Sequence, residues 1–227
     1  MNNQPNRRLQ PVKPSTAALS RWLLSCVLLI SACSFAQTDD AQAPAAPGVV
    51  VDSSKVLIVY LSRTSNTKAV AGMIHQRVGG TLVALELETP YPANYQATVQ
   101  QVARENDTGF LPPLRTRIAN MAQYDVVFVG APTWGMQLPP PMKSFLKQYN
   151  LSGKTIVPFN TNAGYGVGSS FETVKALAPQ STVLEGFTTR GGIERDGVLY
   201  VMEGNKEKQV QTEVQAWLRK LNLLITR

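Results

Sequence analysis

Hydroxyl and amide side chains are concentrated in one short segment between an apolar strand and a helix. Five of the six residues at positions 62–67, Ser-Arg-Thr-Ser-Asn-Thr, carry such a group. Around a helix N-terminus with unpaired backbone N–H groups, they can bind a phosphate dianion, whereas an ordinary N-cap needs only one. The arginine either adds charge to the site or lies on the surface. The predicted anion site consists of Ser62, Arg63, Thr64, Ser65, Asn66 and Thr67.

A tryptophan lies between proline and glycine residues in a second loop. This loop, residues 130–138, reads GAPTWGMQL and is followed by three prolines. An exposed indole in such a loop can stack on a flat heteroaromatic ring. Packing against the protein is the alternative, but a position facing residues 62–67 favours a ligand. The predicted ring-binding residues are Pro132, Thr133, Trp134 and Gly135.

A third loop, residues 160–168, combines amides with glycines in the sequence NTNAGYGVG. Glycines allow a backbone to approach a ligand closely, and neighbouring amides can hydrogen-bond to its edge. The tyrosine either stacks on the outer face of the ring or is incidental to a mobile glycine loop. The predicted contacts are Asn160, Thr161, Asn162, Ala163, Gly164, Tyr165 and Gly166.

The three loops follow strands of a predicted parallel sheet. Apolar strands are expected at 56–61, 81–87, 125–130, 155–160 and 182–187. They alternate with helices expected at 67–78, 95–106, 140–149, 169–177 and 206–221. Fully apolar strands that alternate with helices indicate an α/β domain with helices on both faces of the sheet. Ligands of such sheets lie beyond the carboxyl ends of the strands, where the first, third and fourth strands enter the three loops.

Taken together and in this order, the three loops resemble those of the flavodoxin family. Residues 62–67 are similar to its phosphate-binding segment, residues 130–134 to its inner flavin loop and residues 164–166 to its outer one. The resemblance covers residues 55–187. It implies a flavodoxin-like three-layer sandwich, with a five-stranded parallel sheet in the order 2-1-3-4-5 that flavodoxins are known for. It also implies non-covalent binding of FMN and one- or two-electron chemistry at the flavin.

Two features differ from the family pattern. Ser65 stands where the family usually has glycine. The domain is mildly basic, whereas typical members are acidic, and their negative charge disfavours the anionic reduced flavin and helps to dock basic partners. The redox potential and the type of partner are therefore left open by the sequence.

Three functions fit this fold, because a fold alone does not define an activity. The first is electron transfer through FMN to an unidentified redox partner protein. The second is an FMN-dependent NAD(P)H:quinone or azo reductase, with a quinone-like acceptor. The third is a binding module that has lost the cofactor. Residues 188–204 could distinguish them, since their paired glycines, Asp-Gly and apolar run suggest a hairpin-like excursion that forms a substrate pocket, a docking surface or a surface extension.

Charge and residue types argue against other classes. The formal net charge is +7, but four of the 22 basic residues precede the first apolar run, which leaves 18 against 15 acidic residues. This small surplus, without a basic stripe interleaved with aromatics, argues against nucleic-acid binding. The single histidine argues against triad chemistry and most zinc sites. A glycine pattern at 164–169 imitates a dinucleotide-binding fingerprint but lacks its third glycine.

The first 36 residues are predicted to be an export signal, with a basic start, an apolar stretch at 22–32 and small residues after it. Residues 34–36 suit an ordinary signal peptidase. Residues 30–33 instead resemble a bacterial lipoprotein box, in which Cys33 would carry the lipid. Residues 37–54 are a predicted Ala/Pro-rich linker and residues 55–227 the FMN-binding domain. The expected location is the periplasm, with or without a lipid anchor.

Overall fold

The computed structural model describes residues 52–224. The predicted export signal, Cys33 and residues 37–51 of the predicted linker lie outside this range. At the start of the described chain, the Asp52 side chain accepts a hydrogen bond of 2.9 Å from the N–H of Ser54 and caps the short helix η1 (Ser53–Lys55). No helix within residues 52–224 is long and apolar enough to cross a membrane.

The predicted parallel sheet and its strand order are confirmed. Neighbouring strands follow the order β2-β1-β3-β4-β5, and every pair is parallel. The strands are β1 (Val56–Tyr60), β2 (Thr81–Ala84), β3 (Val126–Pro132), β4 (Thr155–Asn162), β5 (Thr182–Val183) and β6 (Phe187–Arg190). In the centre of the sheet, Ile58 pairs with Phe128 and Phe128 with Val157.

The predicted fifth strand is divided into β5 and β6, both of which pair with β4. Two side chains from other elements explain the interruption. The indole N–H of Trp217 donates to the carbonyl of Glu185 at 2.9 Å. A Cβ on Gly186 would lie 2.5 Å from the ring of Phe171, so a larger residue there would displace that ring.

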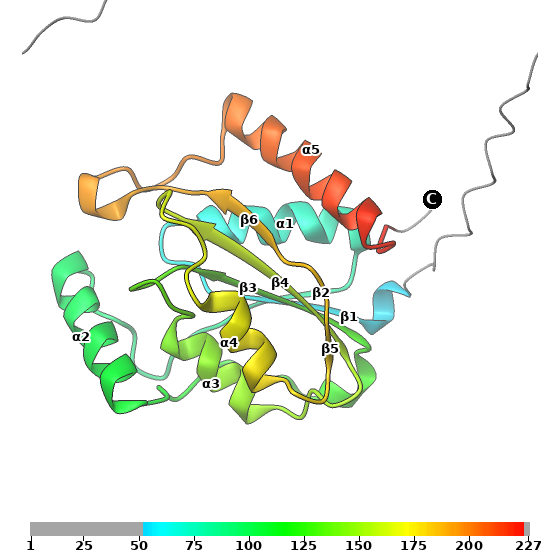
Figure 1. Ribbon diagram of the computed structural model, residues 1–227, viewed down its shortest axis with the longest axis horizontal. Helices are drawn as coiled ribbons and strands as arrows, with labels where there is room; N and C mark the ends of the chain where they lie inside the picture. The colour runs from blue at the N-terminus through cyan, green and yellow to red at the C-terminus, as the bar shows by residue number, and fades with distance from the viewer. Residues whose placement is uncertain (1–51, 225–227) are drawn as a thin grey trace, which may run out of the picture. The chain divides into compact units, whose positions relative to one another are not determined.

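Helices cover both faces of the sheet (Figure 1). One face carries α1 (Asn66–Val78) and α5 (Gly204–Lys220), and the other carries α3 (Pro140–Gln148) and α4 (Ser170–Leu177). Helix α2 (Tyr95–Thr108) lies beside α3. Near its start lies the excursion between β6 and α5, at the end of the sheet where the three loops emerge.

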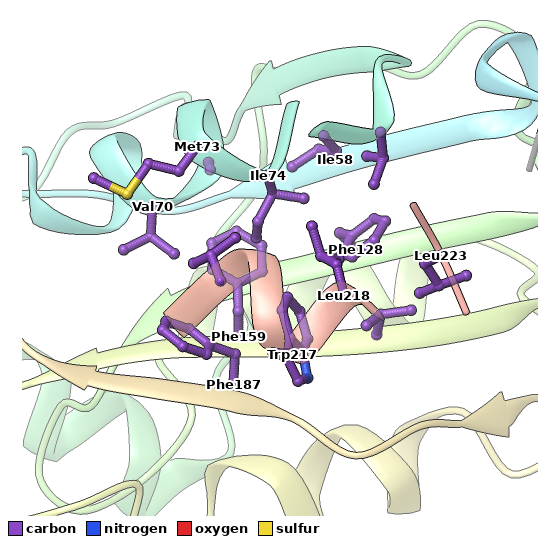
Figure 2. Packing of buried hydrophobic residues seen from close by; sticks show 14 of the residues in the cluster. Ile58, Val70, Met73, Ile74, Phe128, Phe159, Phe187, Trp217, Leu218 and Leu223 are labelled. Carbon is purple, nitrogen blue, oxygen red and sulfur yellow. The ribbon is translucent and has the colours of Figure 1, made fainter. Parts of the chain in front are cut away.

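Each central strand contributes to two cores. In β1, Val56 and Ile58 pack under α1 and α5, whereas Leu57 and Val59 pack toward α3 and α4. Figure 2 shows the first core, in which the Trp217 ring lies with its centroid 5.4 Å from that of Phe187. Burial on both faces explains why these strands are apolar throughout rather than alternating.

Candidate functional site

The 62–67 loop leads directly into α1. Ser65 precedes the helix with a φ of 65°, a left-handed conformation that glycine adopts at lower cost. Lys68 donates its backbone N–H to Ser62 Oγ at 3.2 Å. The N–H groups of residues 64–67 donate no hydrogen bond within residues 52–224. Unpaired N–H groups at the positive end of a helix dipole make this loop suited to an anion.

A hollow of about 110 Å³ lies beside this loop, and we call it the central hollow. All three predicted loops line it. The predicted residues that meet there are Arg63, Thr64, Asn66, Thr67, Pro132, Thr133, Trp134, Thr161, Asn162 and Ala163. Of the other lining residues, Gly191, Gly192 and Glu194 belong to the 188–204 excursion, for which a pocket wall was one of the predicted roles, whereas the sequence did not single out Tyr95.

Buried hydrogen bonds hold the three loops together. The hydroxyl oxygens of Thr67 and Thr161 are 2.8 Å apart, which joins α1 to β4. The amide of Asn160 donates to the carbonyl of Ala131 and to the hydroxyl of Thr133, both at 3.0 Å. Asn160 is only 1% exposed and does not line the central hollow. Its side chain therefore supports the loops from within the protein.

The two predicted stacking residues face different hollows. Trp134 lines the central hollow, and its ring packs edge-on against Tyr91, with centroids 5.4 Å apart and planes at 83°. Tyr165 is 66% exposed and lines a second hollow of about 240 Å³, which we call the outer hollow. The outer hollow lies between residues 133–136 and 162–166, and Trp134 is not part of it.

A tight turn shapes the boundary between these hollows. Trp134 and Gln137 exchange two backbone hydrogen bonds, of 3.1 and 3.0 Å. Gly135 and Met136 between them both have positive φ, 55° and 59°, which is the pattern of a type I′ turn. A Cβ on Gly168 would lie 2.0 Å from the carbonyl oxygen of Met136. The second and third loops therefore touch at a point where only glycine fits.

The excursion after β6 contributes a carboxylate to the site. Ile193 pairs antiparallel with Val198 around the short helix η3 (Glu194–Asp196), so a small hairpin is present where one was suggested. Arg63 Nε lies 2.7 Å from a carboxylate oxygen of Glu194, and both side chains are about one-fifth exposed. The charge of Arg63 is therefore already paired. Sequence spacing held no signal for this contact, because the two residues are 131 positions apart.

A third hollow, about 280 Å³, lies between α2 and the turn at residues 133–137, and we call it the α2 cleft. Trp134, Thr133, Arg63 and Glu194 line both this cleft and the central hollow, so the two adjoin. The α2 residues in its wall are Tyr95, Thr98, Val99, Val102, Ala103, Asn106 and Asp107.

Two ionisable groups near the α2 cleft have shifted pKa values. Burial, then a hydrogen bond to Glu105 and the charge of that carboxylate, raise the pKa of Tyr91 far above its usual value. The phenol therefore stays protonated and holds its ring against Trp134. Burial lowers the pKa of Lys143. No group of three or more histidine, cysteine or acidic side chains suited to a metal ion is found in the described part of the chain.

Comparison with known proteins agrees with this fold. The family model described as "Flavodoxin" matches residues 55–205. A proposed flavoprotein from Bacteroides eggerthii is 27% identical, with a TM-score of 0.59 over 73% of this chain and 96% of its own. A flavoprotein from Lactobacillus acidophilus, solved in complex with FMN, is 22% identical, with a TM-score of 0.55 over 64% of this chain and 98% of its own. No curated protein matches this chain. The parallel sheet, its strand order and the family match show that the chain belongs to the flavodoxin family.

Proposed function

We propose that this domain binds FMN non-covalently and transfers electrons through it. The observation that carries the proposal is the set of unpaired N–H groups at residues 64–67, beside a hollow that all three loops line. In the proposed complex the phosphate takes hydrogen bonds from these groups and from the hydroxyl of Thr64. The ring occupies the outer hollow, in contact with Tyr165. Bound FMN supplies the uptake and release of one or two electrons.

The proposed hydrogen-bond donors, which are the N–H groups of residues 64–67 and the hydroxyl of Thr64, are all neutral. They suit a phosphate that is recognised mainly by uncharged groups. Arg63 already donates to Glu194 and to the carbonyls of Pro92 and Ala93, at 3.0 and 2.7 Å for the two carbonyls. Its cation offsets the carboxylate that would otherwise repel the phosphate. Helix dipole and N–H donors then supply the attraction. The exposed side chains of Met136 and Tyr165 lie at the rim of the outer hollow, where an electron-transfer partner would approach.

Titration of the isolated mature chain with FMN tests this function. We expect one FMN per chain, with quenching of flavin fluorescence and a dissociation constant in the micromolar range or below. Riboflavin, which lacks the phosphate, should bind about tenfold or more weakly if the phosphate takes several charge-assisted hydrogen bonds. No binding at micromolar FMN would exclude the redox functions. Equal affinity for the two flavins would exclude the phosphate site at residues 62–67.

We also propose that the protein is exported to the periplasm. The support is the basic and apolar pattern of residues 1–36, with lipidation at Cys33 as the anchored form. Cell fractionation with a labelled fatty acid tests both forms. A lipoprotein incorporates the label at the membrane and loses it in Cys33→Ser, whereas an ordinary export signal yields an unlabelled periplasmic protein. Cytoplasmic, unprocessed protein would contradict export.

A small-molecule acceptor is the second candidate function. The α2 cleft favours it, because a protein that only docks other proteins does not need a hollow of about 280 Å³ beside its cofactor site.

A further inference from the structure

One stripe of α2 lines the α2 cleft. Val99, Val102, Ala103 and Asn106 follow helical spacing of three and four residues, so they share one face of the helix. Val99 is 43% exposed and Val102 lies deeper, at 5%. Opposite them, Trp134 forms part of the other wall. The cleft therefore has apolar walls, one of them aromatic.

Two residues in the lining of the cleft, Asn106 and Gln137, carry side-chain amides that can donate hydrogen bonds. Lys143 Nζ donates to Asn106 Oδ1 at 2.8 Å and to Gln137 Oε1 at 3.1 Å. Because both amide oxygens are used by the ammonium group, the NH₂ groups are free to donate elsewhere. Neither makes a hydrogen bond to any other group of residues 52–224. This arrangement suits a ligand oxygen that accepts hydrogen bonds.

The charges that line the cleft disfavour an anion. Asp107 and Glu194 both line it, but the cation of Arg63 offsets Glu194, so the carboxylate of Asp107 is the one that would repel a negatively charged ligand. Arg63, the only basic residue in the lining, is paired with Glu194. Lys143 is held behind the two amides rather than in the wall. The preferred ligand is therefore uncharged, although its oxygen atoms accept hydrogen bonds.

We propose that the α2 cleft binds a small, planar, uncharged carbonyl compound of the quinone class. The carbonyl oxygen would accept from Asn106 and Gln137, and the ring would lie between the α2 stripe and Trp134. The volume of about 280 Å³ suits a ligand at the small end of the usual range. Its role as electron acceptor rests on the proposed FMN function, whereas its binding does not. Reduction to the hydroquinone takes two electrons and two protons, which one NAD(P)H and one proton supply overall.

Calorimetric titration of the mature chain with menadione, an uncharged naphthoquinone, tests the site with and without FMN. Ala103→Phe fills the cleft and should weaken menadione binding about tenfold or more. Gln100→Phe makes a similar change at an exposed α2 position outside the cleft and should leave it unchanged. Gln137→Glu keeps an acceptor for Lys143 but removes an NH₂ donor, so about fivefold weaker binding is expected. A naphthoquinone sulfonate should bind more weakly than menadione.

Several results would overturn the proposal. These are no menadione binding, equal binding by Ala103→Phe and the unmodified chain, tighter binding of the sulfonate, or competition between menadione and FMN. The two proposals fail in different ways. If FMN binds and menadione does not, the cleft assignment is wrong and the cofactor site stands. If menadione binds and FMN does not, the cofactor proposal is wrong and the cleft remains a binding site.

Discussion

Arg63 and Glu194 join the 62–67 loop to the excursion after β6, with 2.7 Å between Nε and the carboxylate. The remaining guanidinium nitrogens donate to the carbonyls of Pro92 and Ala93, just before α2. One side chain therefore ties together three segments that surround the central hollow. Because both groups are partly exposed, the pair contributes at most about 1 kcal/mol to stability. Its larger effect is on the charge that a bound phosphate would meet.

Glu194→Gln should tighten FMN binding about fivefold, because it removes a negative charge from the lining of the central hollow and leaves Arg63 unpaired. The amide oxygen can still accept from Arg63, so the excursion stays in place. Fluorescence titration with FMN and riboflavin measures the effect. Riboflavin affinity should not change, since it carries no phosphate. Weaker binding of both flavins would instead show that the ion pair is needed to hold the excursion over the site.

Ser65→Gly should stabilise the domain by about 0.5 to 1 kcal/mol, because serine at a φ of 65° pays a steric cost that glycine avoids. Ser65→Ala is the matched control, since it removes the hydroxyl and keeps the Cβ. We expect no stabilisation from alanine. Urea unfolding of the three proteins measures the difference. If alanine stabilised as much as glycine, the strain would not lie in the backbone.

Gly168→Ala should destabilise the domain by about 2 to 4 kcal/mol, because its Cβ would overlap the Met136 carbonyl and push the second and third loops apart. Gly166→Ala is the control. Gly166 also has positive φ, 87°, but no atom lies within 4 Å of the added Cβ. Its cost should be about 1 kcal/mol, from backbone strain alone. Thermal unfolding measures the loss of stability in Gly168→Ala and in Gly166→Ala. Equal losses in the two variants would rule out the clash with Met136.

Thr67→Val and Thr161→Val should each cost about 1 to 2 kcal/mol, because each leaves one buried hydroxyl without its partner at 2.8 Å. Replacing both removes the pair without stranding a polar group. The double variant should therefore lose less than the two single losses combined. Urea unfolding of the unmodified chain, the two single variants and the double variant measures the four free energies of unfolding in this double-mutant cycle. Additive losses would mean that the two hydroxyls do not interact in solution.

The sequence contained enough information for the parallel sheet and the position of the three loops, and the strand order followed from the resemblance to the flavodoxin family. Burial on both faces makes a strand apolar throughout, and this pattern is local, so β1, β3 and β4 could be located within a few residues. The loop after each strand followed from the same topology. The fifth strand was harder to predict, because its interruption depends on Phe171 and Trp217, which reach it from two helices.

Only the tertiary structure decided how the site residues face one another. Sequence placed Trp134 and Tyr165 in loops at the same end of the sheet, but the indole packs against Tyr91 and lines the central hollow, whereas Tyr165 lines the outer hollow. The spacing of the α2 stripe is visible in the sequence. The sequence does not show that this stripe forms the wall of a cleft. Helical spacing shows which residues share a face of a helix, but not which part of the protein that face contacts. The Arg63–Glu194 pair lacked even such a pattern, since a contact between distant residues follows from the path of the folded backbone.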